Sequence, residues 1–410
     1  MKHIPQAYPN PAERQAALTA ERNRKMAASA HAYVRGSTMR FYEWLERSDR
    51  CSVPDGPEVW ICGDCHVGNL GPVASAAGEL EIQIRDLDQT VIGNPAHDLM
   101  RLGLSLAMAA RGSDLPGVTT AHMLEQMMEG YEAAFIEPAE PPGNETTDHA
   151  DVPRTVTRVM RAAAGRSWKH LADERIEGVK PSIPLGRRFW PLEPAERDAI
   201  DALFDTERLR TLATTLRGRD DTAEVRVMDA AYWRKGCSSL GRLRFAVLAS
   251  VEGHKGRQRH CLMDLKEAIA PVAPRCADAG MPRDNAERVV EGARNLSPFL
   301  GQRMVAARLL DRSVFIRELL PQDLKLEIEH LSRDEAREVA RFLATVVGRA
   351  HVRQMGPDTC AAWHKELQRN RPRNLDAPSW LWSSIVELIG THESAYLEHC
   401  RRYAMLDEAA

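Results

Sequence analysis

Hydrophobic and polar positions near the amino terminus predict two helices followed by two buried strands. Residues 11–32 are rich in Ala and Arg and contain no Gly, which favours a helix, and a second short helix is expected over residues 37–45. An apolar run at residues 59–62 and an alternating run at residues 80–85 each predict a strand. Both strands lead into loops that carry acidic residues.

The middle of the chain has a helical pattern. Leu99, Leu102 and Leu106 recur at helical spacing, with Asp98 at the position of a first-turn acid. Further helices are expected between residues 120 and 218. Three prolines within residues 137–143 predict an irregular connector there, because proline interrupts a helix.

The pattern changes near residue 225 from helical to β-rich. Apolar residues alternate over residues 243–249 and return over residues 261–266, which predicts a hairpin. A second hairpin is predicted over residues 304–319. The region between residues 223 and 323 is therefore expected to form an antiparallel sheet.

Helices are expected between and after these hairpins. Asp284 is placed to cap a helix between them. Apolar residues follow the 3.6-residue period over residues 336–350, with acidic residues at the start, which predicts a long helix. The chain from Trp380 onward is expected to be helical as well.

Composition and charge disfavour two classes of partner. Lys and Arg total 55 against 58 Asp and Glu, a formal net charge of -3, so the chain lacks the broad positive charge of most nucleic-acid-binding proteins. Its apolar stretches are shorter than the roughly 20 residues that cross a bilayer, so no membrane partner is expected. The amino terminus shows no secretion signal, and we expect a cytoplasmic protein whose eight cysteines are free thiols.

Two acidic loops carry the residue types that phosphoryl transfer requires. The first loop, residues 63–69, places a carboxylate at Asp64 and an amide at Asn69. In a kinase catalytic loop an Asp orients or deprotonates the acceptor and an Asn binds metal. The second loop presents Asp86 and Asp88, whose oxygens suit Mg²⁺. An isolated Asp-x-Asp is more often a solvated turn, but the first loop makes the pair informative.

Two other kinds of site share parts of this pattern. Cys62, Cys65 and His66 have the spacing of a metal or redox motif, but a structural zinc site needs a second ligand pair and no other Cys-x-x-Cys occurs. Calcineurin-like metallophosphoesterases also contain Gly-Asp and Asp-x-His elements. Their two-metal site needs further Gly-Asp-x-x-Asp and Gly-Asn-His blocks, and neither follows Asp64. We therefore favour a phosphotransferase.

These residues resemble those of a known group of enzymes. Residues 63–69 and Asp86 are similar to the Gly-Asp-x-His-x-x-Asn loop and metal-binding Asp of aminoglycoside phosphotransferases and related small-molecule kinases. Asp98 resembles the helix start that steadies the catalytic loop in those enzymes. More closely, the chain resembles a kinase-like bacterial family known as domain of unknown function 2252. The matching motifs include Tyr33-x-Arg35-Gly36, Gly63 to Asn69, Asp86-Leu87-Asp88, Gly236 to Gly241, Lys266-Glu267-Ala268 and Arg349-Ala350-His351.

The resemblance implies a kinase-like fold with an unusual chain order. In ordinary kinases the glycine-rich hairpin, its lysine and the paired glutamate precede the catalytic loop, whereas here the matching residues follow it. We predict an α+β, bilobal, protein-kinase-like fold that is circularly permuted, opened between the helix at residues 334–351 and the catalytic loop. Residues 1–222 and 324–410 would form a larger helical lobe, and residues 223–323 a small antiparallel β lobe.

The resemblance also assigns roles within the site. The catalytic residues are Asp64, His66 and Asn69, the Mg ligands are Asn69, Asp86 and Asp88, and the ATP-binding residues are Gly236, Ser238, Ser239, Gly241, Lys266 and Glu291. Lys266 would contact the phosphates, with Glu291 as its partner and Glu287 as an alternative. His66 is expected to fix the loop by hydrogen bonding of its ring. The turn at residues 320–323 would meet adenine through its backbone.

Some roles stay open at this point. Arg35 and Arg101 are each compatible with pairing to the carboxylates, with binding phosphate and with an ordinary ion pair. The expected function is an ATP- and Mg-dependent phosphotransferase for an unidentified small molecule or protein, with residues 110–220 as the expected acceptor region. Transfer of AMP by the same fold and a non-catalytic nucleotide-binding regulator are the alternatives.

Overall fold

Helices and antiparallel sheets make up the computed structural model, which confirms the predicted α+β class. It describes residues 8–48, 53–113, 115–136, 152–168, 181–236, 240–253, 258–276, 279–324, 331–369 and 377–403. The predicted connector at residues 137–143 lies outside these ranges.

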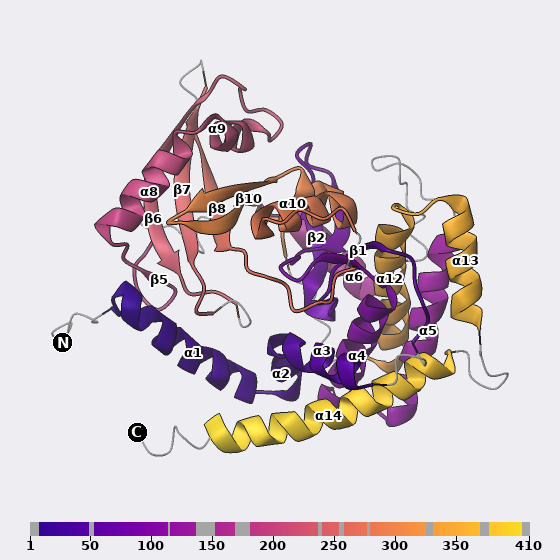
Figure 1. Cartoon of the computed structure of the whole chain (residues 1–410). Coiled ribbons are helices and arrows are strands. Elements are labelled where there is room, and N and C mark those ends of the chain that lie inside the picture. Colours follow the sequence, from indigo (N-terminus) through magenta and orange to yellow (C-terminus); the bar gives the residue numbers. More distant parts are fainter. Residues whose placement is uncertain are drawn as a thin grey trace.

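A six-stranded antiparallel sheet lies at the upper left of Figure 1, with strand order β5-β6-β7-β8-β10-β9. β7 with β8 and β9 with β10 are the two predicted hairpins, which are thereby confirmed. Leu310 and Asp311 join β9 to β10 with φ of 51° and 59°, as a tight two-residue hairpin turn requires. The strands are β5 (Phe189–Trp190), β6 (Glu224–Trp233), β7 (Arg244–Glu252), β8 (Gln258–Glu267), β9 (Met304–Leu309) and β10 (Arg312–Leu319).

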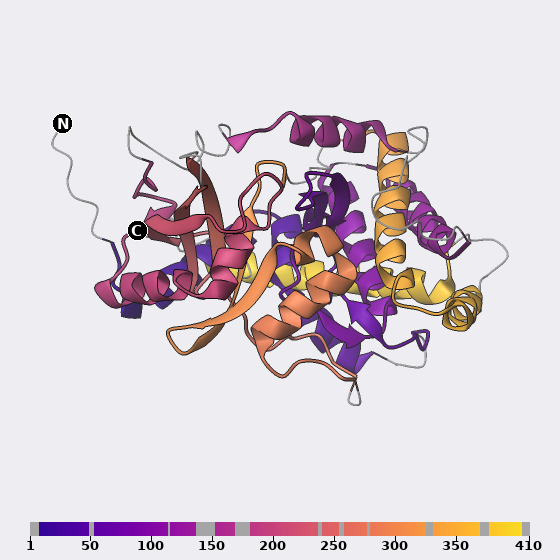
Figure 2. The ribbon, with the colours of Figure 1, turned by 90° about the horizontal axis from the view of Figure 1, so that it is seen from above.

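One helix, α10 (Asn285–Leu296), connects β8 to β9 and lies between the sheet and the helices in both Figure 1 and Figure 2. It begins where predicted, because the Asp284 carboxylate accepts hydrogen bonds from the backbone N–H of Ala286 and Glu287. Val289 and Val290 of α10 pack into the core of the helical part. The short α11 (Pro298–Gly301) follows it.

The helical part is centred on α5 and α12. Gly130 of α5 lies against the backbone of Arg341 in α12, where a Cβ atom would overlap the carbonyl group, so glycine permits the close packing of the two helices. Ser332 begins α12 with a capping box formed with Glu335. The helices of this part are α4 (Ala96–Gly112), α5 (Gly117–Ile136), α6 (Arg154–Ala164), α12 (Arg333–Val352), α13 (Pro357–Gln368) and α14 (Ser379–Tyr403).

The first predicted helix is broken in two, which corrects the expectation for residues 11–32. α1 (Pro11–Ala27) ends, and Ser29 caps a new helix, α2 (Ala30–Gly36), by accepting a hydrogen bond from the N–H of Ala32. Serine at this position competes for the helix backbone and favours a fresh start. The next predicted helix is α3 (Thr38–Arg47).

Two small two-stranded sheets and a 3-10 turn complete the helical part and lead to the candidate site. The predicted strands near residues 59–62 and 80–85 are β1 (Val59–Ile61) and β3 (Leu80–Ile84). β1 pairs with β4 (Val91–Gly93), and β3 pairs with β2 (Leu70–Ala74). The turn η2 (Val67–Asn69) lies between β1 and β2.

The predicted boundary between the lobes at residue 222 stays a prediction. The packing of the helices before it shows which part of the molecule they contact. Two helices, α8 (Pro194–Phe204) and α9 (Glu207–Thr214), share a hydrophobic core with the sheet. Leu18 of α1 belongs to the same core. α8 and α9 therefore pack with the sheet, while Arg217, between α9 and β6, donates its N–H to the Ala76 carbonyl beside β2 at 2.9 Å.

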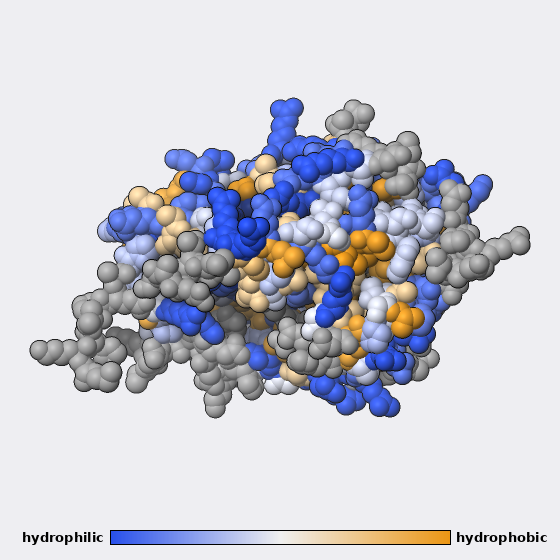
Figure 3. Space-filling view, turned by 90° about the horizontal axis from the view of Figure 1, so that it is seen from below, coloured by the Kyte–Doolittle hydropathy of each residue, from blue (hydrophilic) through white to orange (hydrophobic). Residues whose placement is uncertain are grey.

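The face seen from below in Figure 3 is mainly hydrophilic, with hydrophobic side chains in separate small groups. Val386 and Leu397 of α14 and Met39 of α3 are among the exposed large hydrophobic residues. Among the described helices, none combines the length and apolar character that spanning a bilayer demands.

Candidate functional site

The buried carboxylate of Asp98 holds the backbone of the loop that follows β1. Asp98, in the first turn of α4, accepts hydrogen bonds from the backbone N–H of Cys62 at 2.7 Å and of Gly63 at 2.9 Å. His351 at the end of α12 lies 3.2 Å from the same carboxylate through its Nε2. The predicted role of Asp98 in steadying this loop is confirmed.

Asp64 is buried and paired with a buried arginine. Its Oδ1 accepts a hydrogen bond from Arg101 Nε at 2.8 Å and lies 2.7 Å from Arg101 Nη2. The side-chain amide of Asn69 donates to the backbone carbonyl of Asp64 at 2.9 Å, so the two predicted loop residues do come together. Burial raises the pKa of the Asp64 carboxyl, and the charge of Arg101 opposes that rise. The open question about Arg101 is thereby answered: it pairs with Asp64.

Lys266 of β8 meets the second acidic loop across the boundary between the sheet and the helical part. Its ammonium contacts Asp88 Oδ2 and lies 3.4 Å from Asp86 Oδ1. The Lys266 side chain is only 4% exposed, whereas that of Asp86 is 42% exposed and faces solvent. The second carboxylate oxygen of Asp88 is buried and has no hydrogen-bond partner. Lys266, Asp86 and Asp88 therefore form one ionic cluster.

The two carboxyls of this cluster have opposite pKa shifts. Burial alone would raise the pKa of Asp86, but Lys266 and a hydrogen bond from Asp88 hold it well below its usual range. Burial, followed by the nearby charge of Asp86, raises the pKa of Asp88. Asp86 therefore stays ionised, while Asp88 takes up a proton more readily unless further positive charge lies nearby.

The ionic cluster holds few metal-ligating side chains. No group of three or more His, Cys, Asp and Glu side chains able to hold a metal ion occurs within the described ranges. Mg²⁺ in phosphoryl-transfer sites needs only one or two carboxylates, because waters and substrate phosphates complete its shell. The unsatisfied oxygen of Asp88 is what such an ion would bind. The carboxylates of Asp86 and Asp88 are thus compatible with Mg²⁺, whereas the ligand role of Asn69 stays a prediction.

The sheet face that carries Lys266 has further buried charges, which the sequence analysis missed. Arg244 of β7 donates to both carboxylate oxygens of Asp264, at 2.8 and 2.6 Å, and Arg317 of β10 lies 3.4 Å from the same carboxylate. Arg244 is opposite Lys266 in the ladder, and Asp264 precedes Lys266 by two residues. Strand alternation could have revealed this shared face.

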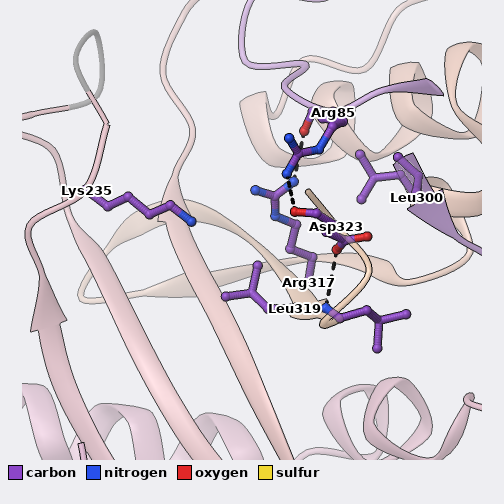
Figure 4. Close-up of a pocket in the computed structure, with 8 residues that line it drawn as sticks. Arg85, Lys235, Leu300, Arg317, Leu319 and Asp323 are labelled. Carbon is purple, nitrogen blue, oxygen red and sulfur yellow. Dashed lines mark hydrogen bonds between the residues drawn. The ribbon is translucent and has the colours of Figure 1, made fainter. Parts of the chain in front are cut away.

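The turn at residues 320–323 is engaged with a second arginine network (Figure 4). Arg85 donates to the Asp323 backbone carbonyl at 2.7 Å, and Arg317 donates to the Arg85 carbonyl at 2.9 Å. Leu320 N–H donates to the Asp323 carboxylate at 3.3 Å. Lys235 extends toward the same pocket, whose volume is about 40 Å³. That volume is far below the roughly 300 Å³ of a typical small-molecule site. The adenine contact predicted for this turn stays a prediction.

Only part of the predicted phosphate-covering loop is described. Gly236 and Gly241 have φ of 99° and 95°, a backbone region that glycine favours. Lys25 of α1 lies 3.5 Å from the Gly236 carbonyl. Ser238 and Ser239 lie outside the described residues.

The predicted partner of Lys266 is not brought to it. Glu291 pairs instead with Arg294 at 3.2 Å, and neither Glu291 nor Glu287 forms an ion pair with Lys266 among the residues that the structure describes. The buried face of α10 presents Arg288, which donates to the backbone carbonyls of Thr90 and of Asp88, the latter at 3.0 Å. The glutamates lie toward solvent because that arginine face is turned inward.

His66 holds the loop in a different way from the one predicted. Its backbone carbonyl accepts the N–H of Asn69 at 2.8 Å, which closes the turn η2. The ring is 4% exposed, and its Nδ1 has no hydrogen-bond partner. The predicted hydrogen bond of the His66 ring is therefore not formed by Nδ1, because no donor or acceptor of the described residues lies within hydrogen-bond distance of that atom.

A family model described as an uncharacterized protein conserved in bacteria, DUF2252, matches residues 14–402. The chain belongs to the DUF2252 family. The match contains every site residue described above, from Asp64 on the first loop to Asp323 on the turn. A search of curated proteins and a search of solved structures each found no match. Membership of DUF2252 therefore confirms the family resemblance, while the kinase-like roles stay predictions.

Proposed function

We propose that this DUF2252 chain is a kinase-like phosphotransferase that uses ATP and Mg²⁺. The observation that carries the proposal is the contact of Lys266 with Asp86 and Asp88, beside the loop of Asp64. A phosphoryl-transfer site needs a cation on the phosphates, carboxylates for metal and a carboxylate for the acceptor. The lysine lies about 180 to 200 residues from the two carboxylate components in the sequence.

The order of elements in the sheet supports a kinase-like arrangement. Protein kinases carry the phosphate-binding lysine on a strand that precedes helix αC. Here β6 and β7 precede β8 with Lys266, then α10 follows, and β9 and β10 lead to the turn at residues 320–323. The lysine strand, the helix and the turn therefore occur in the expected sequence, although Glu291 does not pair with the lysine.

Contacts at the proposed opening point support circular permutation. Just after α12, Gln354 donates to the Trp60 carbonyl at 3.0 Å and accepts the Trp60 N–H at 2.8 Å. Trp60 belongs to β1, which leads into the loop of Asp64. The end of α12 and the start of that loop are thus adjacent in space, although they are distant in the chain. Tyr396 of α14 donates to the Ala27 carbonyl of α1 at 3.2 Å, so the terminal helices also pack together.

In the proposed reaction the acceptor hydroxyl attacks the γ-phosphorus of ATP. A new oxygen–phosphorus bond forms, the bond to the β–γ bridging oxygen breaks, and ADP leaves. Asp64 receives the hydroxyl proton, and its raised pKa makes it a better base than an exposed carboxylate. Arg101 fixes the direction of that carboxylate.

Nucleotide and metal would be held by the remaining groups. Mg²⁺ bound by Asp86, Asp88 and Asn69 would neutralise charge on the phosphates. Lys266 would move from the carboxylates to the phosphates, which is feasible because its stem is flexible. A second pocket, of about 590 Å³ and lined by Leu320, Pro321 and Gln322 of the turn, has the volume to admit a base beside the turn.

Product analysis tests the proposal. The intact chain is incubated with ATP and Mg²⁺, and ADP and pyrophosphate are quantified for the wild type and for Asp64→Asn and Lys266→Met. Phosphotransfer predicts ADP release that both substitutions abolish. Pyrophosphate release instead would indicate AMP transfer. Nucleotide binding without either product, across hydroxyl-bearing acceptors, would favour a regulator and contradict the phosphotransferase.

A further inference from the structure

Arg35 of the Tyr33-x-Arg35-Gly36 motif takes no part in the proposed reaction, and it lies directly against the loop of Asp64. It lies in the last turn of α2, and a Cβ atom built on Gly68 would be 3.2 Å from its Cζ and Nε. The same position would be 3.2 Å from Cε1 of His66. The absence of a side chain at Gly68 therefore lets the guanidinium of Arg35 and the ring of His66 pack closely against the loop.

These donors lack partners. Arg35 makes no hydrogen bond or ion pair with any residue that the structure describes, and its buried Nε is unsatisfied. His66 Nδ1 and Arg101 Nη1 are likewise buried without a partner, in side chains that are at most 4% exposed. Each unsatisfied buried polar group costs about 1–3 kcal/mol. Unpaired buried atoms also occur elsewhere in the described residues, but three of them at one loop favour a ligand that accepts hydrogen bonds.

Positive charge outweighs negative charge around these donors, since the cations Arg35 and Arg101 and the carboxylate of Asp86 all act on the His66 ring. Arg101 is already paired with Asp64. The charge of Arg35 is therefore left uncompensated, and an anion is the ligand that it suits.

Two groups of cations approach the acidic loops from different elements. Lys266, Arg244 and Arg317 come from the sheet and act on Asp86, on the side assigned above to nucleotide and metal. Arg35 and Arg101 come from α2 and α4 and act on His66. The second group lies with the helical part, where kinase-like enzymes build their acceptor sites from variable helices and loops.

We propose that Arg35 and His66 form a binding site for an anionic group of the acceptor, beside Asp64. The acceptor class is then a hydroxyl compound that carries a phosphate or a carboxylate. The planar guanidinium can bind two oxygens of either group, and the His66 ring adds one donor. The identity of the anion as part of the acceptor rests on the proposed function, whereas the anion site itself does not.

The test is titration of inorganic phosphate into the intact chain, first alone and then saturated with Mg²⁺ and a non-hydrolysable ATP analogue. Binding is followed by calorimetry at constant ionic strength. The proposal expects phosphate to bind in both states. Arg35→Gln should weaken that binding about tenfold or more, the effect of losing one charge-assisted interaction. Arg35→Lys, which keeps the charge but not the planar pair of donors, should give an intermediate loss.

Arg40→Gln is the matched control, because Arg40 is exposed on α3 and pairs with Glu43 at 3.0 Å. It should leave phosphate affinity unchanged. Equal phosphate affinity in Arg35→Gln and wild type would overturn the site. Displacement of phosphate by the ATP analogue would assign Arg35 to the nucleotide and overturn the acceptor assignment. Arg35-dependent phosphate binding in a chain that binds no nucleotide would keep the anion site and refute the proposed function alone.

Discussion

Removal of the Lys266 ammonium is the perturbation whose consequence follows most directly from the ionic cluster. Lys266→Met keeps an apolar stem of similar length and leaves Asp86 and Asp88 facing each other without a counter-charge. Breaking a buried ion pair costs about 3–5 kcal/mol. Asp86 is 42% exposed, so solvent weakens its electrostatic interaction with Lys266. We therefore expect the free energy of unfolding to fall by about 2–3 kcal/mol in the absence of metal.

Magnesium should reverse part of that loss, because a divalent cation can replace the missing charge between the two carboxylates. At a concentration several times its dissociation constant, Mg²⁺ should restore about 1 kcal/mol to Lys266→Met. The wild type should gain less, since Lys266 already occupies the position. The assay is urea denaturation followed by circular dichroism, in EDTA and in Mg²⁺.

Lys25→Met is the control for this experiment. Lys25 is 43% exposed and forms a surface pair with Glu21, so its removal should cost less than about 1 kcal/mol. Equal losses in the two variants would refute the reasoning about the cluster. A Mg²⁺ effect of the same size in wild type, Lys25→Met and Lys266→Met would show that the metal does not act at Asp86 and Asp88.

Other substitutions test the packing and charge of the described residues. Arg101→Met should cost about 3–5 kcal/mol of unfolding free energy, because it leaves a buried carboxylate unpaired, and urea denaturation measures the loss. Burial alone would raise the pKa of Asp264, but the charges of Arg244 and Arg317 outweigh it and lower that pKa. The ionised Asp264 carboxylate therefore stabilises the fold above about pH 4, and this contribution is lost as the pH falls below that value. Asp264→Asn should therefore flatten stability below about pH 4 while lowering it at neutral pH, as thermal unfolding at several pH values would reveal. Gly130→Ala should destabilise the chain by about 1–3 kcal/mol through overlap with α12, whereas Gly390→Ala, in open space on α14, should stabilise it by up to about 1 kcal/mol; the opposite order of melting temperatures would contradict this.

Elements that depend on local patterns were predictable from the sequence. Alternation identified the hairpins of β7 with β8 and β9 with β10, and Asp284 marked the start of α10. The break after α1 was missed because Ser29 fits a helix by composition and reveals itself only as a cap. Local signals thus give an element, but they locate its end poorly.

Contacts between distant segments were predictable only where a resemblance supplied them. The approach of Lys266 to Asp86 and the support of the loop by Asp98 followed from motif order. The rotation of α10, which turns Arg288 inward and Glu291 outward, depends on packing with the loop of Thr90 and has no sequence signature of its own. The buried pair of Arg244 and Asp264 was missed because charged residues on a strand are more often exposed.

Nucleotide affinity tests the central claim most directly. A non-hydrolysable ATP analogue is titrated into the wild type, Lys266→Met and Asp86→Asn by calorimetry, with and without Mg²⁺. The account predicts Mg²⁺-dependent binding by the wild type that weakens at least tenfold in Lys266→Met and loses its Mg²⁺ dependence in Asp86→Asn. Unchanged affinity in Lys266→Met, or binding by the wild type that ignores Mg²⁺, would contradict it.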